Sequence, residues 1–276
     1  MLSVNQLTFK VKNKTLIDEL TLNVTPGSFY ALLGRKGSGK TTLLRLCSGL
    51  LEPQSGNIYI NGMDVSKREN KKNILRILGY MGSQDGYFPR LQVMEYLEVY
   101  AHAQGLYGLA ARERCMEVLQ MGHLERRAEQ LVEEQSASVR RELSFLRAII
   151  HRPRLLLLDD PFNGMESAQK LAMEELFAIL AEDEVTVLMA SQSLPDAAHL
   201  CGEIGIIEKG RIISEGICQI FFVRQEARHF YIFVSVKRLR QLLPFCERKR
   251  LCARFQEMVI LSLCILLEAS KMKLHF

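Results

Sequence analysis

Two separated stretches of the chain carry residue types that handle phosphate groups and metal ions. The first is a glycine-rich stretch with the spacing G-x-x-x-x-G-K-[ST], and the second is the pair Asp159-Asp160, which ends the apolar run Leu155–Leu158. Glycines let backbone N–H groups curl around a phosphate, while a lysine adds positive charge and a hydroxyl can bind Mg²⁺. The residues predicted to bind the nucleotide phosphates are Gly34, Arg35, Lys36, Gly37, Ser38, Gly39, Lys40, Thr41 and Thr42.

The carboxylates at the end of the apolar run complete this chemistry. A P-loop nucleotide site takes a second magnesium ligand from the end of a buried strand, and Asp159 has that position. We therefore predict that Thr41 and Asp159 hold the metal. Asp160 lies one residue further on, where a group could polarise the attacking water. The alternative interpretations are an ordinary glycine-rich turn at 34–41 and strand-end carboxylates that cap the next turn.

Strands alternate with helices around these residues. Residues 29–34 and 185–191 are predicted as short buried strands, 154–159 as another, and 203–216 as a hairpin around Lys209-Gly210. Residues 56–65 alternate like one half-buried strand, and helices are predicted at 93–105, 110–122, 138–150 and 167–184. This order predicts an α/β fold with a mostly parallel sheet. The pattern weakens after Gly216, where residues 229–236 are predicted as a strand and 237–245 as a helix. Residues 1–216 are therefore predicted as one domain and 217–276 as a small accessory region.

The combination resembles the ATP-binding subunits of ABC transporters over residues 2–216. The motifs that carry the resemblance are the glycine-rich loop, the segment "LGYMGSQDGYFPRLQVMEYLEVYA" and "DDPFNGME". It implies a P-loop NTPase fold with an antiparallel β subdomain and a helical insert, and ATP and Mg²⁺ as cofactors. By the same resemblance, Gln84 touches Mg²⁺ or water, Gly86–Leu91 helps receive a permease, and Ser136 offers its hydroxyl to a phosphate.

Four positions depart from this family's pattern. "QSASV" (Gln135–Val139) stands where the family has L-S-G-G-Q, and the Cβ atoms of Ala137 and Ser138 are expected to crowd a γ-phosphate from an opposing subunit. Asp160 replaces the catalytic glutamate and is one methylene shorter. Gln192 replaces the switch histidine and cannot become cationic. The adenine-stacking aromatic is missing at Val11, with Phe9 as a possible substitute.

The function implied is that of an ATP-binding subunit of an exporter, similar to the drug, lantibiotic and polysaccharide branch. The subunit dimerises head to tail around ATP, as a homodimer or with a second ATP-binding subunit, and drives a separate transmembrane permease. Because Lys40, Thr41 and Asp159 are retained, we expect good Mg-ATP binding, and because of the four departures we expect slow hydrolysis. The alternative is a nucleotide-gated regulatory subunit with little ATPase activity. ABC ATPases of DNA repair or translation and P-loop kinases fit the length and motifs less well.

Composition adds limits to these expectations. The net charge of +5 is mild, and the basic excess lies at residues 224–254, which could contact lipid, nucleic acid or a partner subunit. We expect no nucleic-acid function. The seven cysteines form no CxxC pair, which favours reduced thiols, and the six histidines show no metal-ligand spacing. The longest apolar stretch, residues 258–267, is too short to cross a bilayer. We expect a cytoplasmic protein that meets the membrane through its permease.

Overall fold

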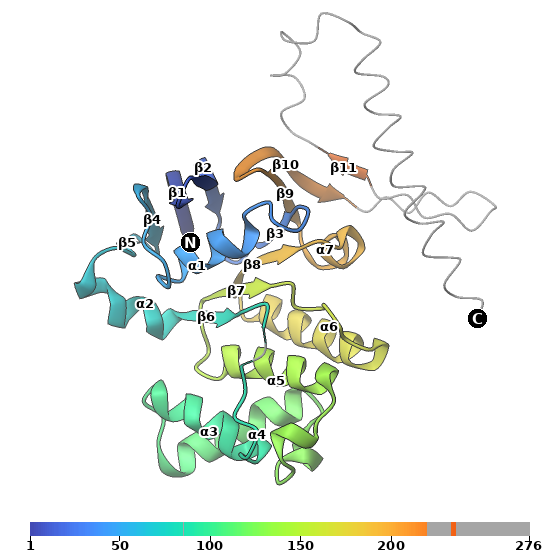
Figure 1. Ribbon diagram of the computed structural model, residues 1–276. Helices are drawn as coiled ribbons and strands as arrows, with labels where there is room; N and C mark the ends of the chain where they lie inside the picture. Colours follow the sequence, from blue (N-terminus) through green and yellow to red (C-terminus); the bar gives the residue numbers. More distant parts are fainter. Residues whose placement is uncertain (85, 220–232, 236–276) are drawn as a thin grey trace, which may run out of the picture.

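The computed structural model describes residues 1–84, 86–219 and 233–235, which form two sheets and surrounding helices (Figure 1). The large sheet has the strand order β11-β10-β9-β3-β8-β7-β6, and the small sheet has the order β2-β1-β4-β5. In the large sheet, β9, β3, β8, β7 and β6 run parallel, whereas β10 and β11 are antiparallel additions at one edge. The predicted α/β class is confirmed, and so is the antiparallel β subdomain.

The elements expected from the sequence occur in the expected order, and the structure adds elements that were not predicted, among them Leu2–Val11, Lys14–Val24, Lys71–Ile77, Leu78–Met81 and Leu194–Leu200. The strands are β1 Leu2–Val11, β2 Lys14–Val24, β3 Phe29–Leu33, β4 Ser55–Ile60, β5 Met63–Asp64, β6 Leu78–Met81, β7 Leu155–Asp159, β8 Thr186–Ser191, β9 Glu203–Glu208, β10 Arg211–Gln219 and β11 Phe233–Ser235. The helices are α1 Lys40–Cys47, α2 Lys71–Ile77, α3 Val93–Ala103, α4 Gly108–Met121, α5 Ala137–Ile149, α6 Ser167–Glu182 and α7 Leu194–Leu200, with short 3-10 turns at Arg68–Asn70, Glu125–Arg127 and Val132–Glu134.

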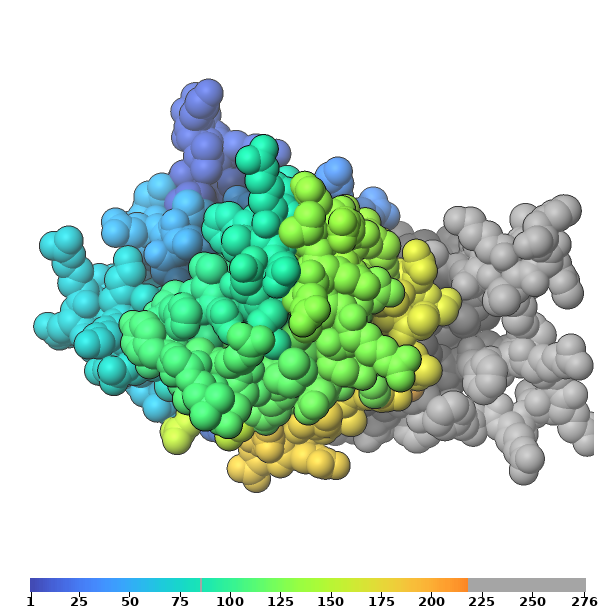
Figure 2. All heavy atoms as spheres, turned by 90° about the horizontal axis from the view of Figure 1, so that it is seen from below, coloured from blue at the N-terminus to red at the C-terminus, as the bar shows by residue number. Residues whose placement is uncertain are grey.

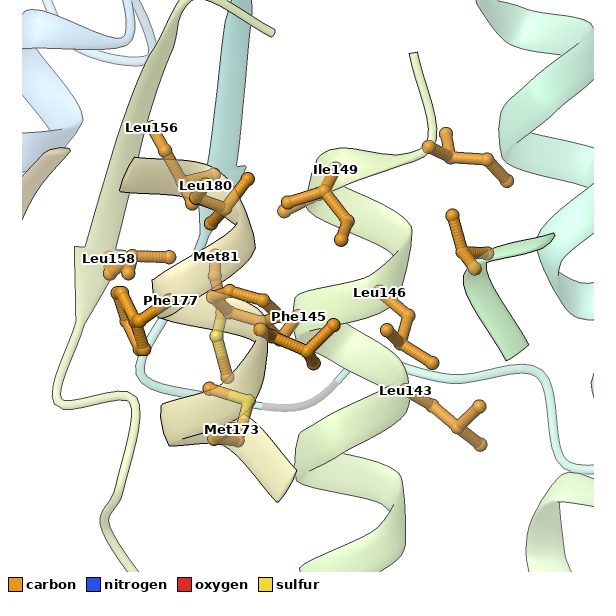
Figure 3. Close-up of a cluster of buried hydrophobic side chains, with 14 of the residues drawn as sticks. Met81, Leu143, Phe145, Leu146, Ile149, Leu156, Leu158, Met173, Phe177 and Leu180 are labelled. Atoms are coloured by element: carbon orange, nitrogen blue, oxygen red, sulfur yellow. The ribbon is translucent and has the colours of Figure 1, made fainter. Parts of the chain in front are cut away.

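The apolar run before Asp159 is buried on both faces of the large sheet. Side chains of a strand alternate between its two faces. Leu156 and Leu158 of β7 therefore join the core beneath α5 and α6 (Figure 3), and Leu155 and Leu157 join the core shared with α1 and the small sheet. A strand covered on both sides needs continuous apolar residues, which explains why this run lacks alternation.

The segment 56–65 differs from its prediction as a single strand. The chain turns at Asn61-Gly62, where φ is positive at both residues (50° and 77°), and β4 pairs with β5 as a tight hairpin. Asn-Gly is the dipeptide that this kind of turn favours, so the signal was present in the sequence.

A helical layer of α3, α4 and α5 lies on one side of the large sheet and forms much of the face in Figure 2. Its contact with the sheet is close at Gly79 of β6, where an added Cβ would come 2.3 Å from the carbonyl oxygen of Ala148 in α5. In the described part of the chain, no helix combines the length and the apolar character that a membrane crossing requires.

The predicted accessory region lies mostly outside the described residues. Of the strand expected at residues 229–236, Phe233–Ser235 are described as β11, paired with β10. The helix expected at residues 237–245 and the basic stretch at residues 236–254 fall outside the description. The division into residues 1–216 and 217–276 therefore stays a prediction.

Candidate nucleotide-binding site

The glycine-rich loop connects β3, a central strand of the parallel sheet, to the first turn of α1. Gly37 and Gly39 have φ values of 83° and 115°, which side chains rarely adopt. At Gly39 an added Cβ would also lie 2.7 Å from the carbonyl oxygen of Leu16, so both conformation and space require glycine. The loop is pinned where Gly210 N donates to Ser38 O at 2.9 Å. A loop held in this way at a helix N-terminus is suited to bind an anion.

The Lys40 ammonium group is turned into the loop that precedes it. Its Nζ donates to Gly34 O at 2.6 Å and to Arg35 O at 3.1 Å, and the residue is 6% exposed. Burial lowers the pKa of Lys40, and the nearby carboxylates of Asp160 and Asp159 act in the opposite direction. The positive charge is therefore held inside the loop, with only carbonyl oxygens as hydrogen-bond partners there.

Asp159 ends β7 beside the start of α1. The residue is 1% exposed, and its Oδ2 is buried with no hydrogen-bond partner among the described residues. Burial raises the pKa of Asp159, whereas the hydroxyls of Thr41 and Ser83 beside the carboxylate lower it. A buried carboxylate oxygen without a donor is costly unless a cation binds it. The oxygen ligands near Thr41 thus fit a small hard cation such as Mg²⁺.

Asp160 and Gln192 hold each other. Gln192 Nε2 donates to Asp160 Oδ2 at 2.9 Å, and the backbone N–H of Gln192 donates to Asp160 Oδ1 at 3.1 Å. Asp160 has a left-handed backbone (φ 49°), and its own N–H donates to Ala190 O on β8. Both carboxylate oxygens are therefore engaged by the residue at the end of the neighbouring strand, although Asp160 itself is only half-buried.

A shallow hollow lies over these residues. It is lined by the glycine-rich loop on one side and by the segment after β8 on the other; the lining residues are Leu33, Gly34, Arg35, Lys36, Gln192 and Leu194. Arg35 and Lys36 are exposed at its edge. Arg35 and Lys36, which the sequence predicted to bind phosphate, therefore line an open surface with their charged side chains.

The segment "QSASV" lies at the start of α5. Ser136 is the N-cap, and its hydroxyl accepts from Val139 N at 3.2 Å. Among the described residues, no hydrogen bond or ion pair joins Ser136 to the phosphate loop of the same chain. Ser138 differs from the expectation that it crowds an incoming phosphate: it is 2% exposed, its Oγ accepts from Glu166 N at 2.9 Å, and the hydroxyl faces Gln169 at 3.3 Å. Its hydroxyl is turned inward, and Ala137 alone of the two is exposed.

The predicted residues Gln84 and Phe9 differ in their exposure to solvent. Gln84 is exposed and follows Ser83, whose hydroxyl lies at the Asp159 carboxylate. Phe9 is corrected: it is 9% exposed and packs in the core of the small sheet, so it cannot stack on a base without leaving that core. Val11 is 47% exposed and has no aromatic ring to offer.

The sequence analysis missed two residues at this site. Ser83 touches the Asp159 carboxylate, and Arg141 binds the backbone around it. The signal for Arg141 was its position three residues after Ser138 and four before Phe145, on the buried face of α5. A charged residue on an apolar helix face calls for a partner. Nothing local distinguishes Ser83 from a loop serine.

These features define the class of the protein. A glycine-rich loop between a central parallel strand and a helix, opposed by a strand-end aspartate with an unpartnered oxygen, is the site of a P-loop nucleotide-binding protein. The helical layer of α3, α4 and α5 and the antiparallel small sheet restrict the choice among P-loop proteins further.

Comparisons with known proteins place the chain within that class. Residues 17–163 match the family described as ABC transporter. The chain is 33% identical over 216 residues to the bacitracin transport ATP-binding protein BcrA of Bacillus licheniformis, covering 78% of this chain and 69% of that protein. It is 32% identical over 247 residues to the Nod factor export ATP-binding protein I of Burkholderia pseudomallei, covering 88% and 80%.

A solved structure described as the ATP-binding subunit of an ABC transporter superposes with a TM-score of 0.72 at 25% identity, covering 79% of this chain and 90% of that one. A dimeric bacterial ABC transporter cassette has the same fold, with a TM-score of 0.72 at 24% identity. The chain therefore belongs to the ABC transporter family, as an ATP-binding subunit.

Proposed function

We propose that the chain binds Mg-ATP and powers a separate exporter permease, with slow hydrolysis of its own. The observation that carries the proposal is the buried, unpartnered Oδ2 of Asp159 beside Thr41. In the proposed site, residues 34–42 bind the phosphates, and Thr41, Asp159 and Gln84 hold the metal. When bound, Mg²⁺ neutralises charge that builds up on the phosphate oxygens.

The protein groups have separate roles in this proposal. The Lys40 ammonium exchanges its carbonyl partners, Gly34 O and Arg35 O, for phosphate oxygens, which carry more negative charge. The N–H groups of the loop orient the triphosphate. Asp160 occupies the position of the general base, and Gln192 that of the phosphate switch. Ser136 serves the nucleotide of the opposing subunit.

The slow hydrolysis rests on the contact between Asp160 and Gln192. A general base must reach a water molecule at about 2.6–3.2 Å, and both oxygens of Asp160 already accept hydrogen bonds. A glutamine cannot take up charge as a histidine can. Each lost transition-state contact lowers the rate by roughly 10- to 10³-fold, and such losses do not add simply.

The partners follow from the family and its named relatives. The two relatives are named as a bacitracin transport and a Nod factor export ATP-binding protein, which supports a permease of the exporter kind. We propose that the chain works in an ATP-bound head-to-tail pair at the inner face of the cell membrane, with residues 86–91 toward the permease. Tyr87 and Phe88 of that stretch are 39% and 50% exposed. Residues 217–276 form the accessory region of this proposal.

The test is the rate of phosphate release by the purified full chain, measured alone and together with its proposed permease. We expect saturable Mg-ATP binding with turnover roughly 10-fold or more below that of an ordinary transporter ATPase. Turnover at the ordinary level would contradict slow hydrolysis. Binding without any phosphate release, even with the permease, would instead support the nucleotide-gated regulatory subunit.

A further inference from the structure

Helix α5 carries a buried arginine whose side chain reaches the metal-site strand. Arg141 is 3% exposed. Its Nη2 donates to Asp159 O at 2.6 Å and to Asp160 O at 2.8 Å, and its Nε donates to Pro161 O at 3.3 Å. Its Nη1 donates to Gly82 O at 2.8 Å. One guanidinium group thus binds the backbone where β7 ends and where β6 leads into the Gln84 loop.

These contacts fix the path of the backbone at the metal carboxylate. The fork of the guanidinium is planar and rigid, so carbonyl oxygens that bind it are restrained in direction as well as distance. A buried cation is also costly to leave without acceptors, which makes these contacts difficult to break one at a time. The carbonyl groups of Asp159 and Asp160 lie on either side of the Asp160 Cα, where the backbone is left-handed (φ 49°). The guanidinium therefore sets the direction in which both carboxylates leave the strand.

A second arginine of the same helix offers a contrast. Arg147 donates to Gly86 O and to the hydroxyls of Tyr96 and Tyr100, each at 3.3 Å, and its guanidinium lies over the Tyr100 ring. It binds the same loop as Arg141, a few residues further on, but none of these contacts reaches β7. Substitutions at the two positions can therefore separate an effect on the loop from an effect on the metal carboxylate.

We propose that Arg141 is a positioning residue for magnesium binding: through the carbonyl groups of residues 159–161 and 82 it holds the Asp159 carboxylate where the metal of bound ATP meets it. This inference rests on the proposed function of the site. It also ties the metal carboxylate to the helix whose N-terminus carries Ser136. A movement of α5 then shifts the Asp159 carboxylate that holds the metal.

The experiment measures the dissociation constant of ATP for the full chain by equilibrium titration, with excess Mg²⁺ and, separately, with EDTA. For Arg141→Gln we expect roughly tenfold weaker binding in Mg²⁺ and a change of at most about twofold in EDTA, because loss of a group that orients a metal ligand typically lowers metal affinity 10- to 100-fold. Arg141→Lys keeps the charge without the fork and is expected to lie between wild type and Arg141→Gln. The control Arg147→Gln is expected to bind as wild type does under both conditions.

Each result has a defined meaning. Equal weakening of Arg141→Gln in Mg²⁺ and in EDTA, or no weakening, would overturn the positioning role while leaving the proposed function intact. Wild-type binding that is indifferent to Mg²⁺ would instead overturn the magnesium site itself. Cooperative thermal unfolding of each variant shows whether it is folded. If neither Arg141 variant folds, Arg141 is a folding residue and the inference is wrong.

A second measurement needs no nucleotide. In the metal-free chain, the amide of Asp160 donates to Ala190 O and the amide of Asn163 donates to Asp160 O. Hydrogen exchange at these two amides should be faster in Arg141→Gln than in Arg147→Gln. Equal exchange rates in the two variants would also contradict the inference.

Discussion

Two adjacent aspartates at the end of β7 have opposite surroundings. Asp159 is buried, and its Oδ2 has no hydrogen-bond partner in the described chain. Asp160 is half-buried, and both of its oxygens are engaged by Gln192. One carboxylate is thus suited to a metal and the other is occupied. Different environments give neighbouring carboxylates different tasks, and this difference supports a site that binds better than it hydrolyses.

At this scale the double variant Asp160→Glu with Gln192→His is expected to raise ATP turnover by roughly tenfold or more. The glutamate reaches one methylene further, and the histidine can become cationic beside a phosphate. Steady-state phosphate release at saturating Mg-ATP measures the effect, with Gln192→Ala as the control that removes only the side-chain hydrogen bond to Asp160 Oδ2. No rise in the double variant would mean that the limitation lies at residues 135–139.

At the scale of the elements, α5 carries polar residues into the core of the helical layer. Glu142 is 1% exposed, and its Oε1 has no hydrogen-bond partner in the described chain. Burial raises the pKa of Glu142 to about 7, although the charges of His123 and Arg127 lower it. This carboxyl group is therefore protonated in the folded chain at pH values where an exposed glutamate is ionised.

The stability of the chain should consequently depend on pH through Glu142. Because the folded pKa is raised above the unfolded value, the folded state binds more protons between pH 4.5 and about 7, and the contribution to the free energy of unfolding is lost as pH rises through that window. Glu142→Gln is expected to differ from wild type by less than about 1 kcal/mol at pH 5 and to be more stable by roughly 2–3 kcal/mol at pH 8.

Urea denaturation at pH 5, 6, 7 and 8 measures this difference, with Glu125→Gln, an exposed position, as the control. A Glu142→Gln chain whose stability follows the wild-type pH dependence in parallel would show that Glu142 is ionised in the fold.

The sequence predicted the elements with continuous or strongly periodic patterns. The leucines of β7 indicated a strand covered on both faces, and the glycine-rich loop indicated its own backbone conformation. What it could not predict depends on tertiary packing. The Cβ atom of Ser138, at a position where the family has glycine, suggested crowding at a phosphate, but Glu166 N and Gln169 hold the Ser138 hydroxyl inward. Phe9 was predicted as a substitute for the ring that stacks on adenine, but it is buried in the core of the small sheet.

At the scale of the whole molecule, the site residues of one chain are incomplete. Ser136 caps α5 and, among the described residues, has no hydrogen bond to the phosphate loop of its own chain, whereas Thr41, Ser83 and Asp159 come together within that chain. Under the proposed function, Ser136 meets the nucleotide of a second subunit. The single chain then binds nucleotide, and the pair encloses it.

We expect Asp160→Asn to accumulate as an ATP-dependent dimer, because its amide keeps a contact with Gln192 and removes the carboxylate from the hydrolytic position. Multi-angle light scattering of the full chain should show a doubled molar mass with Mg-ATP and a monomer with Mg-ADP. A mass that stays monomeric with Mg-ATP would argue that the chain pairs with a different ATP-binding subunit.

The most direct test of the central claim is the affinity of the full chain for Mg-ATP, measured calorimetrically for wild type and for Lys40→Ala. The account predicts saturable binding by wild type and at least roughly tenfold weaker binding by Lys40→Ala, because the variant loses the charge that the loop holds for the phosphates. Lys71→Ala, on the exposed start of α2, should bind as wild type does. An unchanged affinity of Lys40→Ala would contradict the account.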